Sequence, residues 1–554
     1  MRGSSSRGTR EVLQVPVEWW GGPVGQGQWP QSRHARLWEV GRPNSTAEAG
    51  EQRPVFVARS QSCDTRRRKG EPTVNTNRDL HREDQAAEPV EGSRPTKGNT
   101  PQSAASRTQS RTDASIGLQR VREVARRDRR AQFTNLLCHV TVDLLRDSFF
   151  ALKRQAAPGV DGVTWRQYEG NLEARLTDLH TRVHCGTYRA QPSRRVYIPK
   201  GDGRQRPLGI AALEDKIVQQ AMTTVLNQVY EEDFLGFSYG FRPGRNQHDA
   251  LDALWMGLMG KKVNWVLDLD IHAFFDTIDH EWLMSFIEHR IADRRVLRLI
   301  RKWLRAGVSE AGEWSKTSVG TPQGSVASPL LANVYLHYVF DLWVQWWREN
   351  HATGDVIVVR YADDAVVGFQ HRSDAERFHR ELEQRMEKFG LALHPDKTRL
   401  IEFGRFAVAN RQRRGQGKPE TFDFLGFTHI CGKKRRTGGY IVKRKTSAKR
   451  MRTALKRIKQ ALYRWRHLPI PAQAAWLRRV VQGYLNYHAV PGNSEAITAF
   501  RLQVVRHWHK ALRRRSQRHR LPWSRFGPLA DRWIPRARIL HAYPDDRFYA
   551  KHPR

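Results

Sequence analysis

The chain has 554 residues, in which 95 lysines and arginines outnumber 56 aspartates and glutamates to give a formal net charge of +39. So large a cationic excess indicates a polyanionic partner, and nucleic acid is the first candidate. No apolar stretch has the length of a membrane span, and the N-terminus lacks the apolar core of a signal peptide. The cysteines are widely spaced and form no CxxC pair, which argues against a zinc ribbon or a disulfide framework. We therefore expect a reduced, intracellular protein that binds a polyanion.

The first part of the chain differs in composition from the rest. Residues 1–105 are rich in Gly, Pro, Ser, Gln, Arg and Glu and show little periodic apolar pattern. Such a segment cannot bury enough apolar surface to offset the entropy lost on ordering, so we expect disorder there. Ordered structure is expected to begin near "IGLQRVREVARRDRRAQFTNLLCHV" (116–140), because its apolar residues have helical spacing. Whether the segment before it is translated in the cell is left open.

The middle of the chain alternates strand and helix patterns. Residues 263–271, "VNWVLDLDI", form a short apolar, β-branched run that predicts a strand. Residues 355–369, "DVIVVRYADDAVVGF", predict two strands that meet in a hairpin near residues 362–364. The next segment predicts a helix that has Ser373 as its N-cap, Glu376 completing a capping box and Gly390 as its end.

Towards the C-terminus the pattern becomes helical and strongly basic. Residues 421–430, "TFDFLGFTHI", predict one more strand. From residue 447 onward, three segments combine helical spacing with many cations, at 447–468, 474–488 and 495–517. Strands and helices therefore mix up to about residue 430, and helices dominate afterwards.

The adjacent carboxylates Asp363 and Asp364 lie in an otherwise apolar run. Like charges repel and a buried unpaired carboxylate is costly, so a cation must lie nearby, either a Lys or Arg or a metal ion. Neighbouring side chains of a strand point to opposite faces, so only a bend lets both reach one ion, and a further carboxylate is still needed. The run "LDLDIHAFFDTIDH" supplies four candidates, Asp268, Asp270, Asp276 and Asp279.

Oxygen ligands without thiolates or a histidine pair favour magnesium. Two such ions about 3.5–4 Å apart would stabilise the attacking and leaving oxygens of a phosphoryl transfer. The alternative is that these aspartates only cap turns. The basic segments also have two interpretations each. The loop "IPKGDGRQR" (198–206) could hold a triphosphate or be solvated, and the helices after residue 447 could grip nucleic acid or present a solvated face.

Several sequence blocks occur in the order found in one enzyme family. "YADD" follows "VIVVR", with "DLDIHAFFDTIDH" upstream and "GTPQGSVASPLLANVYL" between them, and together these blocks resemble reverse transcriptases. The remaining blocks resemble the bacterial group II intron-encoded kind, so that the resemblance covers roughly residues 105–554. They are "APGVDGVTW" (157–165), "VYIPKGDGRQRPLGI" (196–210), "FSYGFRPGRNQHDAL" (237–251), "LALHPDKTRLIEFG" (391–404), "FDFLGF" (422–427) and "VVQGYLNYHAVPGN" (480–493).

The resemblance implies an α+β right-hand polymerase. Fingers and palm with an antiparallel sheet would occupy residues 106–440, and an α-helical thumb and maturase region would occupy 441–554. No cysteine follows Cys431, so we expect no C-terminal endonuclease of the kind that some family members carry. The implied reaction is RNA-directed DNA synthesis, in which a primer 3′-hydroxyl attacks a deoxynucleotide α-phosphate at two Mg²⁺ ions. A maturase activity would aid intron splicing and mobility.

The implied partners are intron RNA, template RNA, a DNA primer or target DNA, and deoxynucleotide triphosphates. The resemblance places the protein in the bacterial cytoplasm, associated with nucleic acid and without a membrane, and is compatible with a homodimer. It leaves open which intron and DNA target the protein serves, its oligomeric state, its fidelity and its processivity.

The resemblance also implies roles for individual residues. Asp270, Asp363 and Asp364 would be the catalytic and metal-binding carboxylates. Phe275 would lie under the incoming sugar and reject ribonucleotides, whereas Phe274 beside it is expected in the core. The implied nucleotide-binding residues are Lys200, Arg206, Phe275, Gln323 and Lys397, the last of which would protonate departing pyrophosphate. The implied RNA-binding residues on the first basic helix are Lys449, Arg450, Arg452, Lys456 and Arg457.

Two other functions compete with this hypothesis. One is a maturase that only binds and folds intron RNA, with an idle polymerase site. The set of Asp270, Asp363 and Asp364 argues against it, because a pure binding protein does not need three costly carboxylates. The other is a host-adopted reverse transcriptase used in defence, which the intron-type segment "QGYLNYH" (482–488) disfavours.

Overall fold

The computed structural model describes residues 116–199, 205–310, 313–315, 319–434, 436–516, 518 and 520–552. Residues 116–127 are helical, as their apolar spacing predicts. The segment 1–105 and Lys200 lie outside the described residues, so the disorder expected of the first and the role expected of the second stay predictions. Within the described ranges, no helix has both the length and the apolar character needed to cross a membrane.

The N-terminal region consists mainly of helices around one hairpin. Its longest helix, Leu213–Asp233, is buried along most of its length and lies in the largest apolar core. Thr141 and Asn246 each cap the helix that follows by accepting hydrogen bonds from backbone amides. The elements are η3 (Leu137–His139), α2 (Val142–Ala151), α3 (Trp165–Glu169), α4 (Leu172–His184), β1 (Ser193–Pro199), β2 (Gln205–Ile210), α5 (Leu213–Asp233) and α6 (Gln247–Gly260).

The central sheet is antiparallel and has the strand order β6-β7-β3-β8. Its strands are β3 (Trp265–Asp270), β6 (Val356–Tyr361), β7 (Asp364–Phe369) and β8 (Arg399–Glu402). The strand predicted within 263–271 and the hairpin predicted within 355–369 are therefore confirmed. Alternate side chains enter two different cores: Val266 joins the one that contains α6, and Leu267 joins the largest one.

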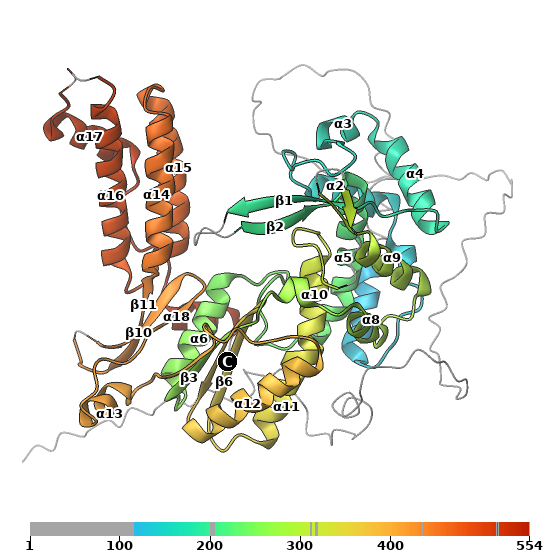
Figure 1. Cartoon of the computed structure of the whole chain (residues 1–554), viewed down its shortest axis with the longest axis horizontal. Coiled ribbons are helices and arrows are strands. Elements are labelled where there is room, and N and C mark those ends of the chain that lie inside the picture. Colours follow the sequence, from blue (N-terminus) through green and yellow to red (C-terminus); the bar gives the residue numbers. More distant parts are fainter. Residues whose placement is uncertain are drawn as a thin grey trace, which may run out of the picture.

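Helices connect and cover these strands (Figure 1). α10 runs directly into a π-helix, η4, which ends at the buried Asp341 and continues as α11. A second sheet, in the order β2-β1-β4-β5, includes the N-terminal hairpin. The bounds are α7 (Phe274–Thr277), α8 (His280–Glu288), α9 (Arg294–Arg305), β4 (Val308–Glu310), β5 (Glu313–Ser315), α10 (Ser328–Leu336), η4 (His337–Asp341), α11 (Leu342–Asn350) and α12 (Arg372–Lys388).

The capping box predicted at Ser373 is wrong. α12 begins at Arg372, and its N-cap, His371, makes no side-chain capping bond. A tertiary contact anchors this first turn instead: the buried carboxylate of Asp374 accepts hydrogen bonds from the amide and hydroxyl of Thr353. The predicted end is confirmed, since Gly390 has a φ of +70° just beyond the last helical residue.

The single strand predicted over 421–430 is also wrong, because the chain reverses inside it. Leu425 and Gly426 have φ values of +48° and +84°, and they turn β9 (Phe422–Phe424) back onto β10 (Phe427–Lys433). The third strand of this sheet is β11 (Tyr440–Thr446), which pairs with β10 along its full length. A short helix, α13 (Ala407–Arg413), precedes the sheet.

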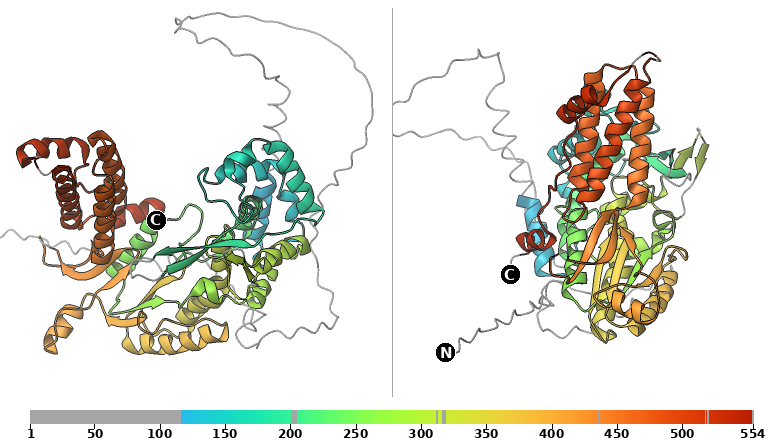
Figure 2. Two further views of the ribbon diagram at one scale, coloured as in Figure 1. Left: turned by 45° about the horizontal axis from the view of Figure 1, so that its top comes forward. Right: turned by 90° about the vertical axis from the view of Figure 1, so that its left-hand side faces the viewer.

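The C-terminal helices form a separate bundle with its own apolar core. In Figure 1 and the left view of Figure 2, this bundle lies at the left and the N-terminal helices at the right, with the β1–β2 hairpin between them. The last helix returns to α6, where Arg547 donates to Asp252 and Lys551 pairs with Asp249. The bounds are α14 (Ala448–Arg464), α15 (Ile470–His488), α16 (Ser494–Arg513), α17 (Trp523–Trp533) and α18 (Pro544–Lys551).

Candidate active site

Strand pairing brings the sequence-predicted carboxylates together at one end of the central sheet. Asp270, the last residue of β3, lies directly opposite Asp364, the first residue of β7. Opposite residues of an antiparallel pair project from the same face, with Cβ atoms about 4.5–5.5 Å apart. Asp268 projects from this face two residues earlier on β3, and Asp363 lies in the turn between β6 and β7.

A buried guanidinium, that of Arg360, holds the turn that carries Asp363. Ala362 has a φ of +57°, which non-glycine residues adopt only when their surroundings impose it. Arg360 donates from Nη1 to the Ala362 carbonyl at 3.0 Å, and Gly240 packs so closely that a Cβ there would lie 2.2 Å from the Ala362 amide. Buried hydrogen bonds and close packing therefore impose the conformation of the turn.

Burial and mutual repulsion raise the pKa values of these carboxyl groups. Burial, with the nearby charges of Asp363 and Asp270, raises the pKa of Asp364 to about 6. Burial raises the pKa of Asp268 to about 7, although Arg399 opposes the shift. Burial also raises the pKa of Asp363, with Asp270 as a further cause. The charged forms of these groups are therefore under-compensated by protein cations alone.

The donor set fits a hard divalent cation. All of the converging ligand atoms are carboxylate oxygens, which magnesium prefers to nitrogen or sulfur. Lys397 places its ammonium 2.7 Å from Oδ2 of Asp270, so a protein cation partly compensates the charge of that carboxylate. Within the described ranges, no three acidic, histidine or cysteine side chains converge tightly enough to form a complete metal site.

The two remaining aspartates of the upstream run have different surroundings. Asp279 is the N-cap of α8 and accepts hydrogen bonds from the amides of Glu281 and Trp282. The turn-capping interpretation is therefore right for Asp279. Asp276 lies within the short helix α7, where its amide donates to the carbonyl of Ala273.

Two of the predicted nucleotide-binding residues, Lys397 and Arg206, lie near the carboxylates. Arg206 extends from β2 and lies close enough to Asp363 to oppose the rise in the pKa of that carboxyl group. Phe275 is half-buried and meets the ring of Phe241 edge to face, with centroids 6.5 Å apart. Phe274 is buried in the core, as expected.

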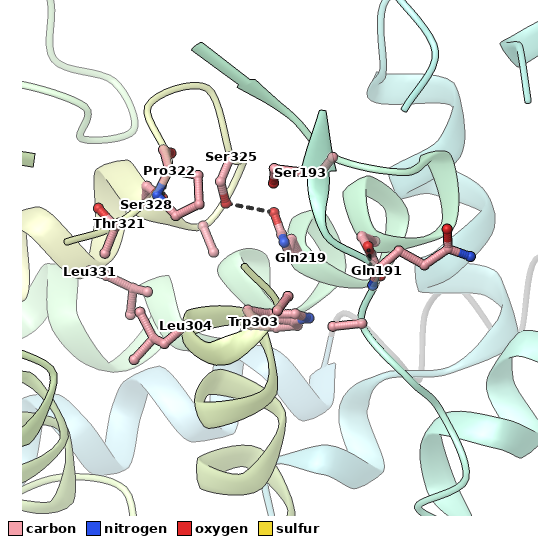
Figure 3. A pocket seen from close by; sticks show the side chains of 15 residues that line it. Gln191, Ser193, Gln219, Trp303, Leu304, Thr321, Pro322, Ser325, Ser328 and Leu331 are labelled. Atoms are coloured by element: carbon pink, nitrogen blue, oxygen red, sulfur yellow. Dashed lines mark hydrogen bonds between the residues drawn. The ribbon is translucent and has the colours of Figure 1, made fainter. Parts of the chain in front are cut away.

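Gln323 lies on a loop that is fixed to the N-terminal region at two places. Its carbonyl accepts a 2.7 Å hydrogen bond from the Gly209 amide of β2, the strand that carries Arg206. Two residues later, the Ser325 hydroxyl donates to Oε1 of the buried Gln219 at 2.9 Å (Figure 3). Hydrogen bonds therefore join this loop both to the β1–β2 hairpin and to α5.

An open groove of about 360 Å³ extends from Asp363 and Asp364 to the C-terminal bundle. Arg450, predicted to bind RNA, is one of its lining residues and opposes the rise in the pKa of Asp364. The other four predicted RNA-binding residues are exposed on α14. The other lining residues were not predicted as site residues, namely Phe241, Gln247, Tyr361, Ala362, Leu425, Tyr487 and His488.

The sequence does contain a local signal for the turn at Leu425. A glycine inside a strand pattern indicates a turn, a bulge or a close backbone approach, and Gly426 interrupts the run at 421–430. The turn at Leu425 and Gly426 faces α14, where the guanidinium of Arg450 lies 3.4 Å from the Cβ position of Gly426. Phe241, Tyr487 and His488 carry no such local signal.

Comparison with known proteins identifies the family of this chain. The family described as "Reverse transcriptase (RNA-dependent DNA polymerase)" matches residues 198–429, a range that includes Asp270, Asp363 and Asp364. Protein YkfC of Escherichia coli is 34% identical over 298 residues, which are 47% of this chain and 78% of YkfC. The chain belongs to the reverse transcriptase family.

Other relatives of this reverse transcriptase are intron proteins by name. "Group II intron-encoded protein LtrA" of Lactococcus lactis subsp. cremoris is 40% identical over 187 residues, which are 33% of this chain and 31% of LtrA. "Uncharacterized 91 kDa protein in cob intron" of Schizosaccharomyces pombe is 44% identical over 146 residues, covering 26% of this chain and 18% of that protein. The chain thus spans most of YkfC and a minority of the length of the other two.

Replacing Phe275 tests the predicted sugar contact. Phe275→Val should increase incorporation of ribonucleotides by about tenfold or more relative to deoxynucleotides, because the ring would no longer clash with a 2′-hydroxyl. The ratio of kcat/KM values for the two nucleotide classes measures this. Phe275→Tyr keeps the ring and should keep the discrimination. Unchanged discrimination in Phe275→Val would mean that the ring only packs against Phe241.

Proposed function

We propose that this reverse transcriptase is the RNA-directed DNA polymerase of a group II intron and also aids splicing and mobility of that intron. The observation that carries the proposal is the direct pairing of Asp270 with Asp364 beside the turn that holds Asp363. The likeness to LtrA supports the intron assignment. Intron RNA, a DNA primer or target DNA and deoxynucleotide triphosphates are then the partners, in the bacterial cytoplasm.

The right-hand arrangement of the polymerase is part of this proposal. Fingers and palm would be residues 106–440, where the β1–β2 hairpin is the finger element and the central sheet is the palm. The thumb and maturase region would be residues 441–554. The groove that extends from Asp363 to Arg450 and Tyr487 supports this division, because the primer end must reach the carboxylates between palm and thumb.

The residues of the site have separate tasks in the proposed reaction. Asp270, Asp363 and Asp364 would hold two Mg²⁺ ions, which when bound stabilise the attacking and leaving oxygens of phosphoryl transfer. Arg206 and Lys200 would bind the triphosphate, and Gln323 would lie beside the nucleotide. Lys397, whose ammonium lies 2.7 Å from Asp270, would give a proton to the departing pyrophosphate.

Two variants separate polymerase from maturase activity. Asp363→Ala should reduce cDNA synthesis by at least about a thousandfold, because the main carboxylate clamp on the metal is lost, while RNA affinity stays nearly intact. A second variant replaces Lys449, Arg452, Lys456 and Arg457 with Gln and should weaken intron binding and splicing assistance more than extension of a short primer. Arg450 is left in place because it lines the groove.

Both variants are assayed for both activities at one salt concentration, since RNA affinity depends steeply on salt. Gln is a good helix former, so α14 should persist, and circular dichroism checks this. Synthesis by Asp363→Ala within tenfold of the parent would overturn the catalytic assignment. Loss of splicing assistance in Asp363→Ala, with the fold intact, would show that the two activities are not separable.

A further inference from the structure

A basic surface lies at the end of the sheets opposite to the carboxylates. We call it the far-end surface and define it by the exposed residues Phe406, Arg413, Lys433, Lys434 and Arg436. The first two come from α13 and its entry, and the other three come from the tip of the β10–β11 hairpin. The two segments adjoin, because the thiol of Cys431 on β10 donates to the carbonyl of Gly404. Figure 1 shows α13 next to these strands.

The cations of this surface lack acidic partners in the part of the chain that the structure describes. Residues 403–419 and 431–446 contain no aspartate or glutamate. Among the described residues, Arg413, Lys433, Lys434 and Arg436 have no acidic side chain within ion-pairing distance, whereas their neighbours Arg411 and Arg414 are paired with Glu420 and Glu402. Clustered cations without acidic partners attract a polyanion.

The far-end surface is too distant to contact the primer terminus. β10 begins at Phe427, two residues after the groove residue Leu425, and ends at Lys433. At about 3.3 Å per strand residue, these ends are roughly 20 Å apart. A nucleic acid held there is therefore either a separate structured region or a duplex that extends well beyond the primer end.

An aromatic ring on the same surface favours RNA with unpaired bases. Phe406 is 54% exposed, although Phe403 before it and Ala407 directly after it are buried. Exposed rings beside cations stack on unpaired bases while the cations contact phosphates. We propose that the far-end surface binds structured RNA outside the primer–template, and the choice of RNA rests on the proposed function.

The test compares two variants with matched loss of charge. The surface variant changes Arg413, Lys433, Lys434 and Arg436 to Gln. The control variant changes four other exposed arginines, Arg294, Arg298, Arg305 and Arg380, to Gln. Both are compared with the parent chain on a structured intron RNA without primer, on a primer–template with a long duplex, and on one with a duplex shorter than the roughly 20 Å spacing.

The surface variant should bind the structured RNA about tenfold or more weakly, with a salt slope shallower by about 0.7 for each lost phosphate contact. It should extend the short primer–template like the parent chain, and the control should bind RNA within about twofold. Equal weakening of both variants would overturn the proposal, as would a loss confined to the long duplex. Failure of the proposed function would instead appear as absent synthesis by the parent chain.

A second inference concerns the turn that holds Asp363. Arg360 and Asp341 form an ion pair whose side chains are 1% and 0% exposed. The guanidinium also donates to Ser238 Oγ, to Asn333 Oδ1 and to the Ala362 carbonyl, so its donors are used within one buried network. Asp341 is the last residue of the π-helix η4. Such π-helical turns are common at functional sites.

We infer that Arg360 is a positioning residue for the Asp363 turn, and that Asp341 orients Arg360. The link to Asp363 passes through the Ala362 carbonyl, which only Arg360 among these groups contacts. Substituting one partner alone would leave a buried charge and unfold the region. A hydrophobic replacement of both partners, Arg360→Met with Asp341→Leu, keeps the volume filled and leaves no unpaired buried charge. It removes the bond to the Ala362 carbonyl together with those to Ser238 and Asn333.

The pair replacement should lower kcat by about tenfold or more and raise the magnesium concentration needed for half-maximal rate, with KM for deoxynucleotides little changed. The control is the same replacement, Arg290→Met with Asp233→Leu, at another buried ion pair whose arginine also donates to backbone carbonyls. It should leave the magnesium requirement unchanged. An equal magnesium shift in both replacements, or none in the first, would show that the Arg360 pair is structural only.

Discussion

The buried ion pair between Arg360 and Asp341 connects the elements on which the site depends. Through Arg360 the pair reaches the Ala362 carbonyl in the β6–β7 turn, and through Asp341 it reaches the end of the π-helix. Breaking one partner of such a pair costs about 3–5 kcal/mol, since the other charge is left buried. The pair therefore ties the geometry of the turn to the packing of the largest core.

At one end of the central sheet the fold brings together carboxylates whose negative charges repel each other. Antiparallel register places Asp270 opposite Asp364, and burial strengthens the repulsion between neighbouring charges. Folding supplies only partial relief, from Lys397 on one side and Arg450 on another. A site that collects negative charge in this way favours the binding of divalent cations, and reverse transcription uses that preference to stabilise a transferring phosphate.

Arg450 links the C-terminal bundle to the carboxylate groove. In sequence it is one of several cations on a basic helix, but in space it contacts the Gly426 turn and lines the groove with Asp363 and Asp364. The first turn of α14 thus contributes a residue to the candidate active site. The return of α18 to Asp249 and Asp252 of α6 ties the bundle to the sheet from a second direction.

The sequence by itself determined the strands at 263–271 and 355–369, the basic helices and the carboxylates, because alternation, helical spacing and charged residues in apolar runs are local features. Tertiary structure alone decided that Asp270 faces Asp364, since strand register is a relation between distant segments. It also decided the first turn of α12, where the buried Asp374 bonds Thr353 and overrides the local capping signal of Ser373. Phe241, Tyr487 and Arg450 converge on one groove because three separate elements pack there, and no short-range pattern encodes that packing.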